Sequence, residues 1–126
     1  MRGVLVIVVT TTAIILLGTT TIHYLERTAA DLAEELLAAQ QAIMGEEWEL
    51  ALDRLNASLT SWQELQPAWS ILLNHKEIDE IQIALERAKE YVVSRDKTSA
   101  LAELAVAKML VEHVPEKERL TWSNIF

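Results

Sequence analysis

Residues Val4 to Ile22 read VLVIVVTTTAIILLGTTTI, and this uncharged run decides how the rest of the chain is interpreted. At about 1.5 Å per residue, a helix of this length covers the roughly 30 Å hydrocarbon core of a bilayer. A threonine hydroxyl in a helix can bond to the carbonyl of the preceding turn, so the threonines are compatible with lipid. The run therefore predicts a transmembrane helix within an N-terminal anchor, residues 1–25.

Two alternatives to an anchor stay open. The run resembles a cleaved secretory signal, with Arg2 as its charged start and Val4 to Leu17 as its apolar part, or a buried helix of a soluble protein. No A-x-A pattern follows, and the helical pattern continues through Leu25, which favours an uncleaved signal-anchor. Because Arg2 is the charge that stays inside, we expect a cytoplasmic N-terminus at the cell membrane and an extracytoplasmic domain, residues 26–126.

The composition limits what this domain can be. The chain has 126 residues, so the part after the anchor has room for one small domain. There is no cysteine, which excludes disulfides and thiolate metal sites. The formal net charge is −8, and no basic stripe offsets it, so nucleic acid is not expected as a partner.

Apolar residues recur every three or four positions in four stretches, as on one face of a helix. They are Ala29, Leu32, Leu36, Ala39 and Ile43; Trp48, Leu52, Leu55, Leu59 and Trp62; Ile78, Ile81, Leu85, Ala88 and Val92; and Leu101, Leu104, Ala107, Val111 and Val114. Short connections between such helices favour antiparallel neighbours. The predicted fold class is all-α: an N-terminal transmembrane helix followed by an antiparallel bundle of three to four helices. A helical solenoid repeat is the alternative.

The stretch between Gly18 and Gly45 contains no helix breaker, so the anchor is expected to continue into the first amphipathic helix as one stalk. Gly45 is expected as the C′ residue that ends it. Pro67 fits the first turn of a short separate helix, with a bend near Gln66.

Later boundaries follow from caps and from the second proline. Asn74 and Glu77 have the spacing of a capping box, which predicts a helix start at about His75. Asp96 or Thr98 is expected to cap the last long helix. That helix is expected to end before Pro115, because the residue before a proline disfavours helical geometry.

Several segments of the exported part carry a likeness to a known family. They are Glu47-Trp48, Trp62, Trp69, HKEIDEI at 75–81, Arg87, Tyr91, LAEL at 101–104, EHVPEKE at 112–118 and NIF at 124–126. On these segments the chain resembles a family of short, N-terminally membrane-anchored proteins from spore-forming Gram-positive bacteria, catalogued as a domain of unknown function. The resemblance implies the same bacterial membrane layout. It also implies an accessory-subunit role, because members are often encoded beside polytopic membrane proteins, and it supplies no catalytic residue.

His75 and Asp79 stand four apart on one predicted helix, where they could share a metal ion or a proton. Zinc needs a further ligand, for which His113 or Glu112 is the candidate. Helix capping and solvated carboxylates are the favoured interpretation of the same residues, so no metal and no cofactor are predicted.

The tryptophans divide into two groups. Trp48 and Trp62 have the spacing of core residues, whereas Trp69 lies beside a proline, where an exposed aromatic would mark a contact surface. The tail after Pro115 changes from charged to apolar, and it either folds back over the open end of the bundle or docks on a partner. The interaction candidates are Trp69, Trp122, Ile125 and Phe126.

The chain shows no catalytic triad, phosphate loop or H-E-x-x-H motif, so no catalytic residue and no enzyme activity are predicted. The favoured function is an accessory or scaffolding subunit whose partners are the bilayer and a polytopic membrane protein, with homo-oligomers left open. The alternative is a domain that senses a ligand or a cation, and a hydrolase is a more distant one.

Overall fold

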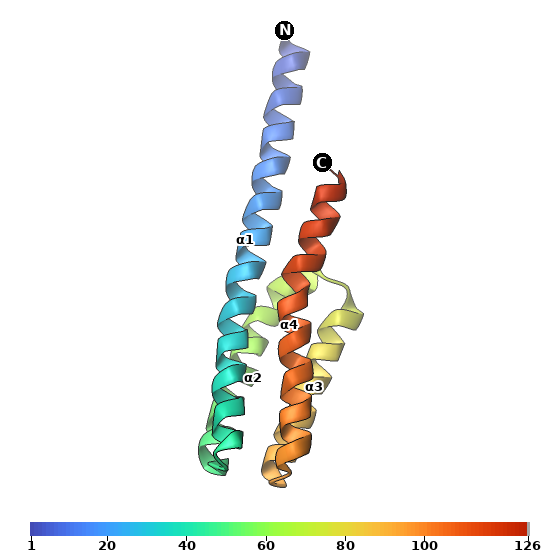
Figure 1. The fold of residues 1–126 in the computed structure, drawn as a ribbon. Helices are drawn as coiled ribbons and strands as arrows, with labels where there is room; N and C mark the ends of the chain where they lie inside the picture. The colour runs from blue at the N-terminus through green and yellow to red at the C-terminus, as the bar shows by residue number, and fades with distance from the viewer. Residues whose placement is uncertain (126) are drawn as a thin grey trace.

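The computed structural model describes residues 1–125, with only the backbone described for Ile125. These residues form four α-helices, shown in Figure 1: α1 (Arg2–Met44), α2 (Trp48–Leu72), α3 (His75–Val93) and α4 (Lys97–Ile125). The prediction of an all-α fold is confirmed.

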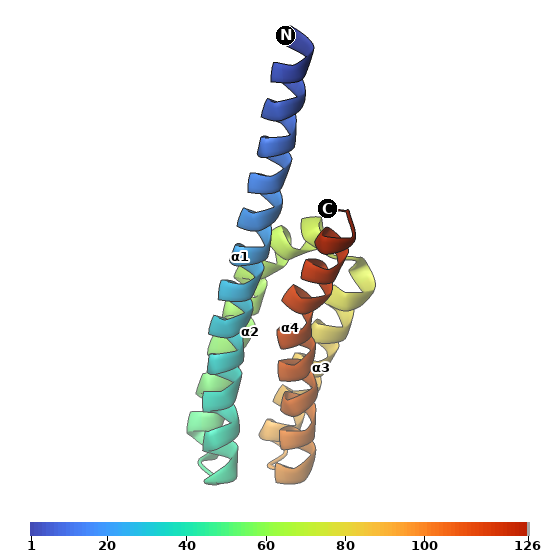
Figure 2. The ribbon, with the colours of Figure 1, turned by 45° about the horizontal axis from the view of Figure 1, so that its top comes forward.

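The first helix, α1, runs from the apolar stretch into the amphipathic one without a break. Its N-terminal part extends beyond every other element in Figures 1 and 2. In its second half, the predicted stripe from Ala29 to Ile43 is buried in the core. The predicted continuous stalk is therefore confirmed as a single helix.

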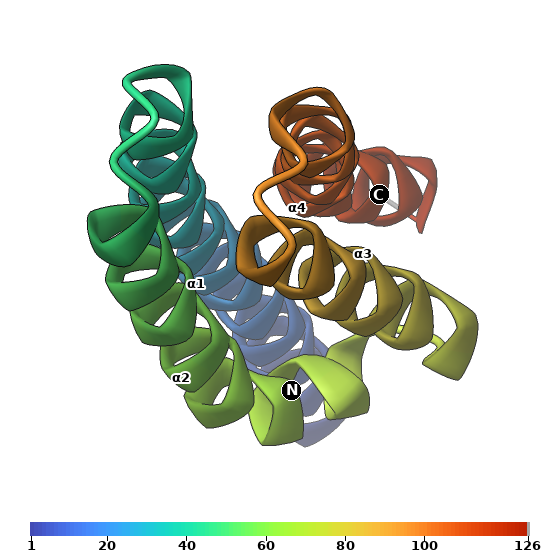
Figure 3. The same ribbon diagram turned by 90° about the horizontal axis from the view of Figure 1, so that it is seen from below.

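Helices that are neighbours in the bundle run antiparallel to each other, as Figure 1 shows. Helix α1 contacts α2 and α4, and α3 contacts the same two helices. Figure 3, seen from below, shows the four helices around a common centre. The core contains Leu36, Leu55, Leu85 and Leu104, one from each helix and all 0% exposed. The bundle is thus held by one face of each helix, as the apolar periodicity predicts.

Helices α1 and α2 are joined by a tight turn with a left-handed residue. The N–H of Glu47 donates to the carbonyl of Ala42 at 3.0 Å, and the N–H of Glu46 to that of Ile43 at 3.0 Å. Glu46 has a φ of 56°, whereas Gly45 has a φ of −81°. The prediction that Gly45 is the C′ residue is wrong by one position, because Gly45 still bonds to Gln41 and belongs to the last turn.

Helices α3 and α4 are joined by a turn of the same kind. Arg95 has a φ of 58°, and the N–H of Asp96 donates to the carbonyl of Tyr91 at 2.9 Å. The carboxylate of Asp96 accepts the N–H of Ser99 at 3.1 Å, so Asp96 and not Thr98 caps α4. The predicted cap of α3 is confirmed, since the Asn74 side chain accepts a hydrogen bond from the backbone of Glu77.

The prediction that Pro67 opens a separate helix is wrong. Helix α2 continues through Pro67 to Leu72, and Figure 3 shows its last turns bending away from the rest. A proline inside a helix removes one backbone hydrogen bond and kinks the axis. The Ser70 hydroxyl donates to the Gln66 carbonyl at 2.6 Å across this bend. The bend predicted near Gln66 is present, but within one helix.

The prediction that the last helix ends before Pro115 is also wrong. Helix α4 continues to Ile125, with Pro115 buried inside it. The turns after the proline are held by contacts outside α4: Lys117 binds Glu77, and Arg119 pairs with Glu26. These long-range contacts fix the position of the turns beyond Pro115, where the proline leaves one backbone hydrogen bond unmade.

Candidate functional site at the junction of stalk and bundle

The N-terminal part of α1 is a bare apolar helix. Its large apolar side chains from Val4 to Leu17 are between 46 and 65% exposed. By length and composition the helix can cross a membrane, a test that a signal sequence or a buried core helix also passes. Only 6% of its most apolar window is buried, so this segment is not a core helix of the described bundle.

Gly18 is the first buried residue of α1, and it is covered by Trp122 of α4. A Cβ atom at Gly18 would lie 3.0 Å from Cε3 of the tryptophan ring, closer than packed carbons tolerate. Glycine therefore permits the ring to rest directly on the α1 backbone. The structure thus brings together a residue of the predicted anchor and one of the predicted interaction candidates.

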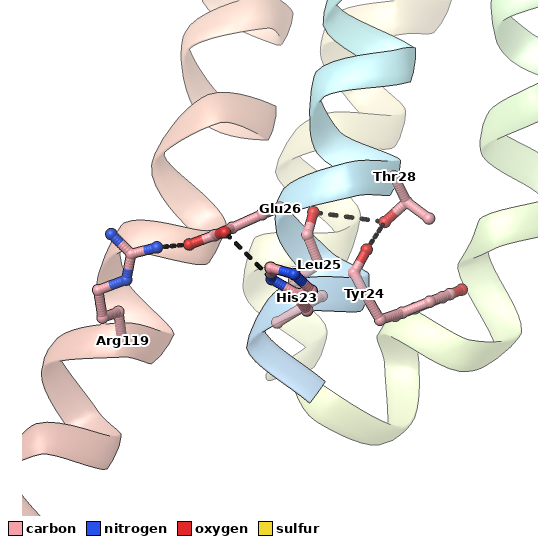
Figure 4. Close-up of polar contacts among 6 residues, drawn as sticks. All are labelled: His23, Tyr24, Leu25, Glu26, Thr28 and Arg119. Atoms are coloured by element: carbon pink, nitrogen blue, oxygen red, sulfur yellow. Dashed lines mark hydrogen bonds and ion pairs between the residues drawn. The ribbon is translucent and has the colours of Figure 1, made fainter. Parts of the chain in front are cut away.

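About two turns further along α1, Glu26 links α1 to α4. Figure 4 shows its carboxylate between the guanidinium of Arg119, with which it forms an ion pair, and the ring of His23. The His23 Nδ1 lies 3.8 Å from Glu26 Oε2. Because the Arg119 side chain is 62% exposed, the ion pair contributes little to the stability of the fold. Its main effect is to fix the position of α4 relative to α1.

The opposite side of α1 is tied to α2 at the same level. The Thr28 hydroxyl donates to the Tyr24 carbonyl at 2.8 Å, as Figure 4 shows, and accepts the indole N–H of Trp69 at 3.1 Å. The Trp69 ring also meets Trp62 edge to face, with centroids 5.6 Å apart. We call residues 18–28 of α1, together with Arg119 and Trp122, the junction.

This arrangement corrects the expectation for Trp69. Its side chain is 0% exposed, so the exposed position on which its role as an interaction candidate depended is not found. The reason is the bend after Pro67, which directs the end of α2 toward Thr28. Trp62 is in the core, as predicted, and its N–H donates to Gln82 at 2.6 Å.

The expectation that the tail folds back is wrong, whereas its docking on a partner stays a prediction. The tail does not fold back over the end of the bundle; α4 continues as a helix along α1, and Trp122 packs on Gly18. The side chain of Ile125 and all of Phe126 lie outside the described residues.

A groove between α1 and α4 leads away from the junction. Small and apolar residues of α1, including Ala30, Ala33 and Leu37, line one side of it. Charged residues of α4, Lys108 and Glu112 among them, line its other side. Sequence reasoning missed this groove, because it depends on which helices become neighbours.

A family model for a domain of unknown function, DUF4363, matches residues 19–125. The chain belongs to this family. No curated protein and no solved structure matches the chain. The DUF4363 match covers the whole bundle and the junction except Gly18, and its description names no activity.

The metal candidates of this DUF4363 chain are not assembled into a site. Among the described residues, no group of three or more His, Asp or Glu side chains can hold a metal ion. His75 and Asp79 are exposed on the surface. His113 lies 3.5 Å from Glu116 instead of completing a ligand set with them.

Glu77, beside these candidates, already has a cation from the chain itself. Lys117 Nζ donates to Glu77 Oε1 at 2.7 Å, and this hydrogen bond, together with the charge of Glu77, raises the pKa of Lys117. Burial, with a further contribution from the charge of Glu77, raises the pKa of Glu118. The α3–α4 edge therefore acts as an interhelical contact.

Proposed function

We propose that the protein is a single-pass membrane protein whose helical bundle, outside the cytoplasm, binds another membrane protein as an accessory or scaffolding subunit. The observation that carries this proposal is the bare apolar half of α1. A helix with exposed Val, Leu and Ile on all sides is unfavourable in water and is stable when lipid covers it.

The internal bonding of this segment supports a lipid environment. The Thr10 hydroxyl donates to the Val6 carbonyl at 2.9 Å, and the Thr19 hydroxyl to the Ile15 carbonyl at 2.9 Å. A hydroxyl that is satisfied within its own helix needs no water. The single basic residue at its start, Arg2, favours a cytoplasmic N-terminus.

Because the chain has no cysteine, anchor and orientation can be tested with one introduced thiol. We expect a Val93→Cys variant to stay in the membrane pellet after alkaline carbonate extraction. We also expect a membrane-impermeant maleimide to label it in intact cells. Release by carbonate contradicts the anchor, whereas labelling only after lysis contradicts the orientation.

The α1–α4 groove is the proposed contact surface for the partner. It begins at Glu26 and Arg119, where the apolar half of α1 ends, so it is continuous with the anchor. A transmembrane helix that lies beside α1 in the bilayer and continues past its surface would meet this groove. A polytopic membrane protein presents helices of that kind.

The partner is tested by crosslinking at native expression, followed by purification in detergent. We expect a polytopic membrane protein to be crosslinked to the wild type and to Ile83→Glu, but not to Leu37→Glu. The two side chains are comparably exposed, 48% for Ile83 and 40% for Leu37, but only Leu37 lines the groove. Recovery of the wild-type chain alone contradicts the subunit role, and equal crosslinking of both variants contradicts the groove.

A further inference from the structure

On two neighbouring helices, α1 and α4, the sequence changes from charged to uncharged residues at the same height along the bundle. On α1, no Asp, Glu, Lys or Arg occurs between Arg2 and Glu26; on α4, Arg119 is the last charged residue before the uncharged residues 120–125. The Glu26–Arg119 ion pair holds these two boundaries together. Figures 1 and 2 show the end of α4 running beside the N-terminal half of α1. We call residues 120–125 the α4 tail.

The α4 tail reaches past the end of the apolar run. Trp122 packs on Gly18, which lies on the apolar side of Ile22. At 1.5 Å per residue, the separation of Gly18 and Ile22 along the axis is about 6 Å. If the run from Val4 to Ile22 spans the hydrocarbon core, the Trp122 ring lies about 6 Å inside the edge of that core, roughly one helical turn from the interface where tryptophan is enriched.

Two hydroxyl groups of the α4 tail are bonded within their own helix, as lipid contact requires. The Thr121 hydroxyl donates to the Lys117 carbonyl at 3.1 Å, and the Ser123 hydroxyl to the Leu120 carbonyl at 2.9 Å. The same kind of bond occurs at Thr19 of α1. Leu120 is 63% exposed, a large apolar side chain in the uncharged α4 tail.

We propose that the α4 tail lies in the lipid interface beside the anchor, so that the domain meets the bilayer at two points instead of one. The lipid surface covers Leu120, and Trp122 is held between lipid and the α1 backbone. The inference rests on the anchor of the proposed function. It adds a second membrane contact, and thereby fixes the rotation of the bundle relative to the membrane plane.

The test compares three spin-labelled cysteine variants of the full chain in phosphatidylcholine vesicles. Leu17→Cys reports on the anchor, Leu120→Cys on the α4 tail and Val93→Cys on the far end of α3. The native side chains are matched in exposure, at 65, 63 and 60%. The measurement is the collision rate of each label with oxygen, which concentrates in lipid, and with a nickel chelate, which stays in water.

We expect the labels at positions 17 and 120 to be more accessible to oxygen than to nickel, and the label at position 93 to show the reverse. A nickel-accessible label at 120 with a lipid-exposed label at 17 overturns the tail inference and leaves the anchor intact. A label at 120 shielded from both reagents overturns it too, since protein and not lipid then covers the tail. A nickel-accessible label at 17 removes the anchor itself.

Discussion

The two halves of α1 use apolar residues in opposite ways. From Val4 to Leu17 they occur on all sides of the helix and are exposed, whereas from Ala29 to Ile43 they form one stripe that is buried against α2 and α4. One continuous helix therefore presents two kinds of surface, and the junction is where they meet. The first half of α1 therefore needs apolar surroundings that the described residues do not supply.

The largest expected effect comes from the same substitution made in each half. Leu36→Ala removes a fully buried side chain and should lower the free energy of unfolding by about 2–5 kcal/mol. Leu16→Ala, in the exposed half, should leave the unfolding of the bundle unchanged. Urea titration of the detergent-solubilised protein, followed by circular dichroism, measures both. Equal losses of unfolding free energy in the two variants would contradict the difference between the two halves of α1.

An introduced charge should affect membrane retention when it is placed in the exposed half of α1, but not when it is placed in the buried half. Val9→Arg places a cation about a third of the way into the apolar run. At the centre of such a run an arginine opposes insertion by about 2.5–3.5 kcal/mol, and this is the upper limit for the effect at Val9. We expect this variant to shift toward the soluble fraction after carbonate extraction. Leu37→Arg, in the bundle half, should stay in the membrane fraction. If Val9→Arg stays in the membrane fraction to the same extent as the wild type, lipid does not surround the apolar half of α1.

The junction should respond to a larger side chain at Gly18. Gly18→Val forces the Trp122 ring to move and should cost about 1–3 kcal/mol. Trp122→Ala should remove much of that cost, giving a coupling energy of about 0.5–3 kcal/mol in a double-mutant cycle. Thermal unfolding of the four proteins in detergent gives the coupling. Additive effects would show that ring and glycine do not touch.

The smallest effect is expected from pH, and only in the bundle. The raised pKa of Lys117 means that its contact with Glu77 stabilises the fold fully below pH 10.5 and is lost as the pH rises through the raised value. The Lys117 side chain is 67% exposed, so the change is small. Unfolding midpoints of the wild type and Lys117→Met should differ below pH 10.5 and converge above it. A constant difference would contradict this origin.

The helices themselves could be predicted from the sequence, because each depends on local periodicity and capping. The buried stripe of α3 and the caps at Asn74 and Asp96 use residues within a few positions of one another. The same is true of the continuity of α1, which required only the absence of a breaker.

The errors share a different cause. Pro67 was expected to start a helix and Pro115 to follow the end of one, but α2 and α4 continue through them. In both helices the turns beyond the proline contact residues that are distant in the sequence. Trp69 is buried because it reaches Thr28, and Arg119 finds Glu26 across most of the chain. Pairings of this kind depend on which helices become neighbours, and one sequence without structure does not show that. The change from charged to uncharged residues on both α1 and α4 was the available signal for the junction.

The central claim is that α1 is one helix in two environments. Spin labels at successive single cysteines along α1, in vesicles, test it most directly. We predict oxygen-accessible labels on every side of the helix up to Leu17, and beyond Thr28 a repeat of shielded and water-accessible positions every three to four residues. Water accessibility throughout residues 4–17, or highly mobile labels between Thr19 and Thr28, would contradict the account.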